Sequence, residues 1–127
     1  MVALFKTLGE ENRLRILNIL MHFELCVCEL EVILNLSQSN VSRHLAKLKS
    51  IGIIRSSKDA QWIHYIASEK FVSENPHLIE YLNYQFQKDL KLQEDLHKCR
   101  VYKNSTYNCQ TITNDRQTVA DYIHQSI

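Results

Sequence analysis

Two cysteines separated by one residue, Cys26 and Cys28, are the residues of this sequence best suited to chemistry. Thiolates are soft ligands that select arsenic(III), antimony(III), cadmium or copper(I) over hard ions. Inside a regular helix, residues two apart point about 200° away from each other and cannot hold one ion. The two thiols can therefore converge only where the chain is extended or where a helix has just begun.

The elements that must position this thiol pair are predicted to be mostly helices. Apolar residues at helical spacing predict helices over residues 2–8, 11–21 and 27–34, the last beginning just after Cys26. Ser37 is a suitable N-cap for a fourth helix, because its hydroxyl can accept a hydrogen bond from a free N–H of the first turn. Gly52 is a suitable left-handed C-cap for the same helix.

The period of the apolar residues changes after Gly52. Residues 53–55 and 62–66 read as two strands, and the polar residues between them as the turn of a hairpin. A long helix is predicted from Pro76 to Cys99, followed by a polar tail with a weak helix that carries Val119, Ile123 and Ile127. The fold class expected is mainly α with a small β-hairpin, arranged as a winged helix-turn-helix.

The predicted long helix carries more apolar surface than one small core can cover. Ile79, Leu82, Phe86 and Leu90 line one side, and Tyr84, Leu92 and Leu96 add to it. We therefore expect a homodimer formed through the N-terminal and long C-terminal helices, which would bury this surface. We therefore divide the chain into a DNA-binding and dimerisation domain, residues 1–99, and a C-terminal extension of unknown role, residues 100–127.

The fourth helix has the character of a DNA-recognition helix. Val41, Leu45 and Leu48 bury one side of it, which leaves the opposite side free to enter a major groove. His44 borders the buried side and is expected to pack or hydrogen-bond rather than contact a base. Residues 38–64 carry five Lys and Arg residues against Asp59 alone, so this face is basic. The residues predicted to contact double-stranded operator DNA are Gln38, Ser39, Asn40, Ser42, Arg43 and Lys47 of the helix, with Arg55 and Lys58 of the hairpin.

Composition limits the alternatives. A chain of 127 residues supports one domain, and its apolar runs are too short to span a membrane. No secretory signal is expected, so the four cysteines read as reduced thiols of a cytoplasmic protein. An enzyme is not expected, because no His is placed as an obvious base for either cysteine and no Gly-rich loop is present. A winged-helix module that binds protein rather than DNA stays open.

Residues 11–67 resemble the ArsR/SmtB family of bacterial metal-responsive repressors. The resemblance is carried by residues 13–17 (RLRIL), 24–30 (ELCVCEL), 38–48 (QSNVSRHLAKL) and 62–65 (WIHY), together with Gly52. It implies a homodimer that represses its own operon from an inverted repeat. It also implies that the segment around Cys26 and Cys28 is a site for arsenic(III), antimony(III) or another soft metal, which acts as the inducer; no other cofactor is expected.

The sequence departs from the resemblance at the third ligand. Arsenic sensors of this type often carry a third cysteine where this chain has Glu31, and a carboxylate is a hard ligand. The third ligand is then Cys99, Cys109, a small thiol from solution, or absent. Two further signals remain open for a repressor of the same fold, namely a soft divalent metal and an oxidant or reactive sulfur species that forms a disulfide.

Overall fold

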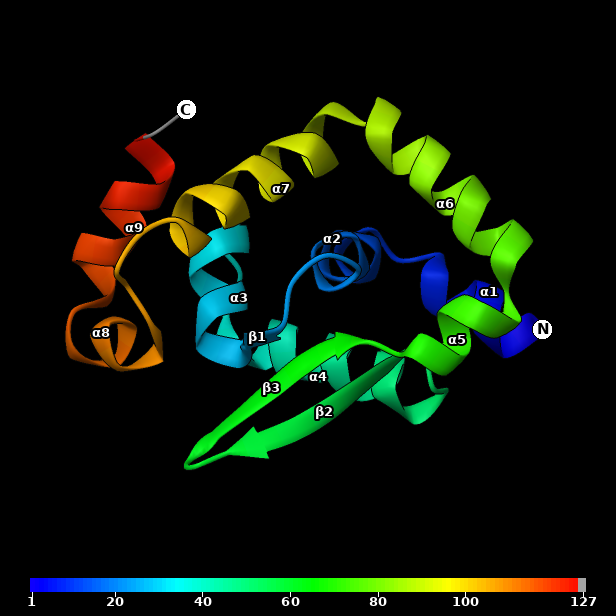
Figure 1. The fold of residues 1–127 in the computed structure, drawn as a ribbon, viewed down its shortest axis with the longest axis horizontal. Helices are drawn as coiled ribbons and strands as arrows, with labels where there is room; N and C mark the ends of the chain where they lie inside the picture. Colours follow the sequence, from blue (N-terminus) through cyan, green and yellow to red (C-terminus); the bar gives the residue numbers. More distant parts are fainter. Residues whose placement is uncertain (126–127) are drawn as a thin grey trace.

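The computed structural model describes residues 1–125 and confirms a mainly helical fold with a small antiparallel sheet (Figure 1). The predicted apolar position Ile127 lies outside the described residues. The elements, in chain order, are α1 (Val2–Leu8), α2 (Glu11–Leu20), β1 (Leu25–Cys26), α3 (Val27–Leu34), α4 (Gln38–Ser50), β2 (Ile54–Asp59), β3 (Trp62–Ala67), α5 (Glu69–Glu74), α6 (Pro76–Lys88), α7 (Leu90–Lys103), α8 (Cys109–Asn114) and α9 (Arg116–Gln125).

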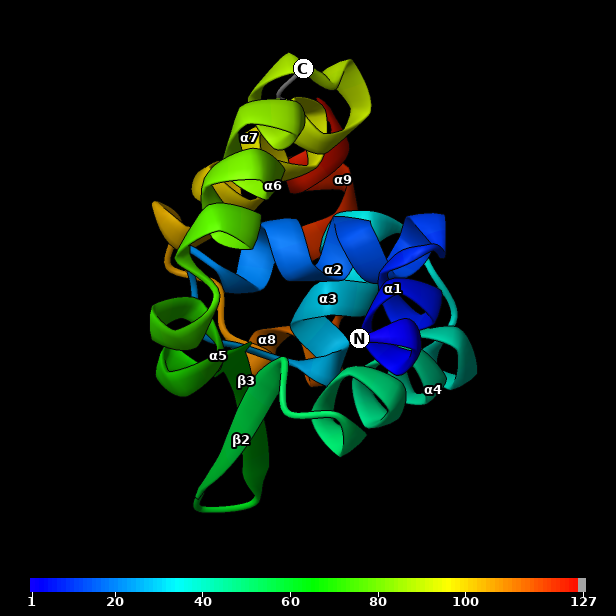
Figure 2. The same ribbon diagram turned by 90° about the vertical axis from the view of Figure 1, so that its right-hand side faces the viewer.

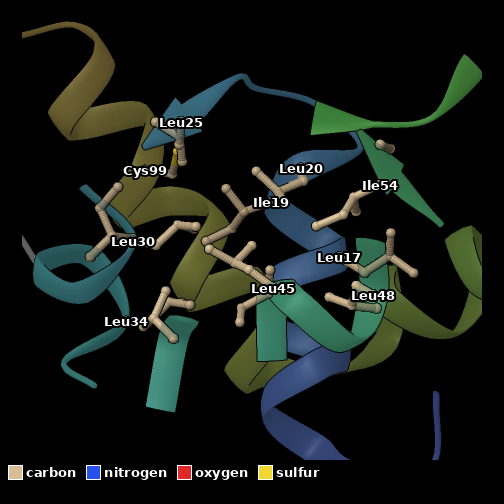
Figure 3. Packing of buried hydrophobic residues seen from close by; sticks show 14 of the residues in the cluster. Leu17, Ile19, Leu20, Leu25, Leu30, Leu34, Leu45, Leu48, Ile54 and Cys99 are labelled. Carbon is tan, nitrogen blue, oxygen red and sulfur yellow. The ribbon is translucent and has the colours of Figure 1, made fainter. Parts of the chain in front are cut away.

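Helix α2 lies at the centre of the molecule. In Figures 1 and 2, α6 and α7 form an arch on one side of α2, and α4 lies on the opposite side with the β2–β3 hairpin. The hairpin projects away from the helices. Apolar residues of α2, α3 and α4 fill the interior, and Leu17, Leu30 and Leu45 are each at most 1% exposed (Figure 3). Helix α4, the predicted recognition helix, and the thiol-bearing helix α3 therefore share one core.

Helix α4 begins and ends where the sequence predicts. The Ser37 hydroxyl accepts a hydrogen bond from the Asn40 N–H at 3.3 Å, and the preceding connection turns through Asn35 in the left-handed conformation (φ 55°). At the other end Gly52 has φ 83°, a region that favours glycine, and the Ile53 N–H donates to the Leu48 carbonyl at 3.0 Å. These caps set the length of the helix.

The sheet contains a strand that the sequence does not signal. The strand order is β1-β3-β2, with both pairs antiparallel. In β1, Leu25 lies opposite Tyr65, and Cys26 lies opposite His64. The first hairpin strand runs further than predicted, to Asp59, because a tight turn with Ala60 at φ 56° joins it to β3, which begins at Trp62 as predicted. One of the two thiols is thus part of the sheet that forms the wing.

The prediction of one helix from Pro76 to Cys99 is wrong. Asp89 interrupts it with extended backbone (φ −90°, ψ 115°), and its carboxylate accepts a hydrogen bond from the Leu92 N–H at 3.1 Å. Asp is a strong N-cap residue, so a second helix starts there. The break turns α7 back over α2 and α3 instead of letting it continue along α6 (Figure 1). The predicted boundary between residues 99 and 100 falls within α7.

The break also changes which apolar residues are exposed to solvent. Leu90, predicted to line the apolar side of the helix, is 87% exposed beside the break. Leu92 and Leu96, predicted to add external apolar surface, are instead buried within the chain, because α7 packs on α2. A buried ion pair also joins α2 to α7, with Arg15 Nε 2.8 Å from Asp95 Oδ2.

Residues after α7 pack onto the thiol-bearing helix. Helices α8 and α9 both contact α3, and Val119 and Ile123 of α9 are buried, as the spacing of the weak helix predicts. The His124 side chain hydrogen-bonds the Val32 carbonyl at 2.9 Å. Over the described residues, no helix is both long enough and apolar enough to cross a membrane.

Candidate functional site

The two thiols of the pair converge at the start of α3. Cys26 is the last residue of β1 and the N-cap of α3, with extended backbone (φ −94°, ψ 172°). Cys28 is the second residue of the helix, and its Sγ lies 3.1 Å from Cys26 Sγ. The chain thus takes the extended entry that the two-residue spacing requires if both sulfurs are to reach one ligand.

A third sulfur joins them from a distant part of the chain. Cys109 begins α8, and the Sγ atoms of Cys26, Cys28 and Cys109 all lie within 4.8 Å of one another. Cys26 and Cys109, 83 residues apart in sequence, are in bonding contact as a disulfide. This three-thiol cluster (Cys26, Cys28 and Cys109) has two possible chemistries: soft-ion binding when reduced and a reversible disulfide when oxidised.

Cys99, the other candidate for the third ligand, is not part of this group. Its side chain is 0% exposed and packs in the core among leucines (Figure 3). Burial raises the pKa of its thiol to about 12. A buried thiol of this kind is a small core residue, so the structure favours Cys109 by position.

Two carboxylates beside the cluster are already engaged. Glu29 accepts a hydrogen bond from the Cys26 N–H at 2.9 Å and another from the Tyr102 hydroxyl of α7. Glu31, at the position of the missing third cysteine, lies 2.8 Å from Arg116 of α9. Both carboxylates therefore tie the C-terminal helices to α3. The spacing Cys26-x-x-Glu29 imitates the capping box of a helix start, a signal that could have found the role of Glu29.

The surroundings of Cys28 oppose its ionisation. Burial is the largest cause, and the negative charges of Glu29 and Glu31 add to it. Together they raise the pKa of the Cys28 thiol to about 11. The favourable effect of the helix N-terminus is outweighed. At neutral pH Cys28 is a protonated thiol, so an incoming ligand has to displace its proton.

The predicted DNA-contacting residues of α4 lie on the side of the helix away from the core. Gln38, Ser39, Arg43 and Lys47 are exposed, and Asn40 and Ser42 are half-buried. Arg43 donates a hydrogen bond to the Asn40 side chain at 3.2 Å. The helix thus presents a polar and basic surface to solvent. In the ribbon, α4 lies beside the hairpin (Figure 2).

The two basic residues of the hairpin differ in their surroundings. Arg55 makes two hydrogen bonds to Glu69 of α5, at 2.8 and 2.7 Å, so its guanidinium is already paired. Lys58 is exposed near the tip of the hairpin. Of the two, Lys58 is the side chain better placed to meet a phosphate.

The thiol cluster adjoins both elements that are predicted to contact DNA. Helix α3, which begins at the cluster, packs on α4, and the backbone of Cys26 pairs with that of His64 in the wing. Just before β1, the Glu24 carboxylate accepts a hydrogen bond from Ser57 of β2 at 3.1 Å. The cluster is therefore joined to α4 through α3, and to the hairpin through β1.

His44 lies on the buried side of α4 and is 1% exposed, in agreement with the prediction that it packs in the interior. Arg13 Nε donates to His44 Nδ1 at 3.2 Å, so this nitrogen is unprotonated. Burial, and then the positive charge of Arg43, lowers the pKa of His44 below its usual value of 6.5. The neutral imidazole is the form that fits the folded chain.

The lowered pKa of His44 makes stability depend on pH. As pH falls through about 6.5, the unfolded chain takes up the proton before the folded chain does. The free energy of unfolding is therefore expected to fall from pH 7.5 to pH 5.5, by up to about 1.4 kcal/mol per pH unit for this group. Urea unfolding at several pH values measures it.

The matched variant for this test is His44→Gln, which removes the titrating group. It should flatten part of the pH slope even if it lowers stability at every pH. His22, whose pKa burial and then Arg100 also lower, leaves a residual slope in the variant. An unchanged slope in His44→Gln would contradict the assignment.

Comparison with known proteins agrees with this arrangement of elements. Residues 10–56 match the family described as "Bacterial regulatory protein, arsR family". Over 65 residues the chain is 45% identical to the "Arsenical resistance operon repressor" of Escherichia coli. This alignment covers 50% of this chain and 56% of that protein. Over 62 residues it is 44% identical to the cadmium resistance transcriptional regulatory protein CadC of Listeria innocua, and this alignment covers 48% of this chain and 52% of that protein. The chain spans about half the length of these curated relatives.

A solved structure extends the likeness beyond the matched segment. Reduced HlyU from Vibrio cholerae is 41% identical, with a TM-score of 0.55 over 64% of this chain and 85% of that one. The family match ends at residue 56, whereas Cys109 lies in α8. The thiol pair thus falls inside the matched residues and the third sulfur falls outside them.

Proposed function

The chain belongs to the arsR family of bacterial regulatory proteins, and we propose that it is a cytoplasmic transcriptional repressor. In this proposal, its homodimer binds double-stranded operator DNA and releases it when arsenic(III) or antimony(III) binds the three-thiol cluster. The proposal depends most on the approach of the Cys26, Cys28 and Cys109 sulfurs to within 4.8 Å of one another.

DNA binding is assigned to α4 and the hairpin. Gln38 and Ser39 occupy the first turn of α4, where a recognition helix meets base edges in the major groove. Asn40, Ser42, Arg43 and Lys47 continue along the helix towards bases and phosphates. Lys58 is assigned a phosphate contact, and Arg55 reaches one only after it leaves Glu69.

The homodimer is assigned to α1 and α6. Phe5 of α1 is 56% exposed, and Tyr81 and Tyr84 of α6 are 60% and 55% exposed. Large apolar side chains on the surface of a single chain favour a contact with a second copy. The surface of α7 is not included, because its apolar residues Leu92 and Leu96 are buried within the chain.

Arsenic(III) is assigned to the cluster because it forms bonds to thiolate sulfur. Arsenous acid, As(OH)₃, exchanges its three hydroxyl groups for three thiols, and three water molecules leave. Cys26, Cys28 and Cys109 would provide these ligands. The exchange draws the three sulfurs around one atom, which moves β1, and with it the wing, relative to α3 and α4.

Fluorescence anisotropy of promoter DNA with the reduced protein tests the proposal. Titration with arsenite should release the DNA at about one equivalent per chain, and a Cys109→Ser variant should need far more arsenite. Complete release requires that binding favour the free state by roughly 5.5 kcal/mol. Tight DNA binding that ignores arsenite would remove arsenic as the signal.

A redox signal is the second candidate, because Cys26 and Cys109 are in disulfide contact. Two thiols would lose two electrons and two protons to an oxidant and form this bond. The discriminating measurement is DNA release by a disulfide-forming oxidant with metals chelated, followed by reduction. Reversible release under these conditions, with no response to arsenite, would favour the redox function.

The pH dependence of binding separates arsenic(III) from a soft divalent metal. Arsenous acid takes up the thiol protons as water, so its affinity should stay nearly constant between pH 6 and pH 8. Cadmium displaces the protons of thiols such as Cys28, whose pKa is about 11. With three thiols, its affinity should rise up to roughly 1000-fold per pH unit. Isothermal titration at several pH values measures both slopes.

A further inference from the structure

The third sulfur of the cluster reaches the thiol pair from a distant part of the chain. Cys109 follows Cys26 by 83 residues, and α8 and α9 bring it there by packing on α3 (Figure 1). When the disulfide between these two residues is reduced, no covalent bond holds their sulfurs together. The effective concentration of Cys109 at the thiol pair then depends on how firmly α8 and α9 are docked.

A charged contact joins α9 to α3 beside the cluster. Arg116 Nη1 of α9 donates a hydrogen bond to Glu31 Oε1 of α3 at 2.8 Å. The Glu31 side chain is only 9% exposed, and it lines the same hollow of about 310 Å³ as Cys26 and Cys28. A carboxylate this deeply buried requires a counter-charge. The free energy of pairing this carboxylate therefore favours the docked position of α9.

Helix α9 is in turn connected to the segment that carries Cys109. The ring of Tyr122, on α9, meets the ring of Tyr107 edge-on, with the ring centroids 5.2 Å apart. Tyr107 stands two residues before Cys109, in the connection from which α8 begins. A contact that fixes α9 on α3 therefore also fixes the start of α8, and with it the third sulfur.

We propose that Arg116 is a positioning residue of the sensing site, whose ion pair with Glu31 keeps Cys109 beside Cys26 and Cys28. The inference rests on the proposed function and deepens it, because it concerns the same three sulfurs. Glu31 stands where a third cysteine is expected, and its carboxylate serves here as the dock for α9. Arg116 acts through the position of Cys109 and is not a ligand itself.

The effective concentration of Cys109 at Cys26 can be measured without DNA and without arsenic. In the full-length chain, Cys28→Ser and Cys99→Ala leave Cys26 and Cys109 as the two remaining cysteines. Oxidised glutathione takes two electrons and two protons from this pair, which gives the protein disulfide and two molecules of reduced glutathione. The equilibrium constant of this exchange has the units of a concentration and is the quantity sought.

Arg116→Gln should lower this effective concentration about tenfold, because it leaves the buried carboxylate of Glu31 without its counter-charge. Arg116→Lys, which keeps the positive charge, should recover most of the loss. The matched control is Gln117→Ala, since the exposed Gln117 side chain donates to Asp121 within the same helix at 2.8 Å. Equal effective concentrations in Arg116→Gln and Gln117→Ala would overturn the proposal.

A double-mutant cycle separates the ion pair from a general loss of stability. Glu31→Gln/Arg116→Gln should lose no more than Arg116→Gln alone, because neither charge is then left unpaired. Losses that simply add in the double variant would show that the two residues act independently, and would also overturn the proposal. With all four cysteines present, Arg116→Gln should raise the half-effective arsenite concentration for DNA release about tenfold, and Arg116→Lys should raise it less.

Failure of this inference and failure of the proposed function give different results. If arsenite releases DNA from the parent protein but Arg116→Gln keeps the effective concentration of the control, the repressor stands and the positioning role falls. If Arg116→Gln lowers the effective concentration but arsenite releases no DNA from the parent protein, the positioning of Cys109 stands and the proposed function falls.

Discussion

Cys28→Ser is expected to bind operator DNA like the parent protein and to lose release by arsenite. Loss of an outer partner of a metal ligand already costs about 10–100-fold in affinity, so loss of a ligand itself should raise the half-effective arsenite concentration at least about 100-fold. Cys26→Ser should behave alike. Ser is also a favourable N-cap residue, so it suits the start of α3 where Cys26 now stands.

The control for this prediction is Cys99→Ala. It removes a thiol that is buried outside the three-thiol cluster, so the arsenite response should persist even if some stability is lost. Anisotropy of labelled operator DNA measures affinity and release in one titration. Normal release by Cys28→Ser would show that the signal enters the protein elsewhere.

Asp95→Ala is expected to destabilise the protein by about 3–5 kcal/mol, because it leaves a buried guanidinium without its counter-charge. Arg15 donates to Asp95 through Nε and Nη2, at 2.8 and 3.0 Å, and Nη2 also donates to the Leu34 carbonyl at 3.1 Å. The hydrogen bond to Asp95 is the main cause that raises the pKa of Arg15. Urea unfolding measures the change.

Glu94→Ala is the matched control on the same helix. The Glu94 side chain is 51% exposed and pairs with Lys98 one turn later, so its loss should cost less than about 0.5 kcal/mol. The double variant Arg15→Met/Asp95→Leu should recover most of the stability lost in Asp95→Ala. Equal costs for Asp95→Ala and Glu94→Ala would contradict the importance of the buried pair.

The elements before residue 68 could be predicted largely from local signals. The start of α4 follows from the Ser37 cap, and its end from Gly52, whose φ is positive. The convergence of Cys26 and Cys28 also follows locally, because a residue just before a helix is extended and one just inside it is not. Such features depend on a few neighbouring residues, which is why spacing alone identifies them.

The C-terminal half could not be predicted in the same way. The apolar pattern of residues 76–99 is compatible with one helix, and only the capping preference of Asp89 opposes it. Whether Leu92 and Leu96 face a second copy or α2 depends on the pairing of Asp95 with Arg15, which are 80 residues apart. The contacts of Glu31 with Arg116 and of Glu29 with Tyr102 are equally remote in sequence.

The choice between Cys99 and Cys109 illustrates the same limit. Both lie after the hairpin, and no local pattern ranks one above the other. The break at Asp89 decides it, since it directs α7 across α3, places Cys99 in the core and brings the start of α8 to Cys26. A single helix boundary thus determines which sulfur lies beside Cys26 and Cys28.

The position of Cys109 outside the family match has an evolutionary consequence. The residues assigned to DNA recognition lie in α4 and the hairpin, whereas the third sulfur stands on a helix that follows them by many residues. Under the proposed function, mutations in α8 would therefore alter which inducer is recognised while the operator sequence stays the same. Natural variation among orthologues in this stretch would then diversify the response of a regulon without rewiring its promoters.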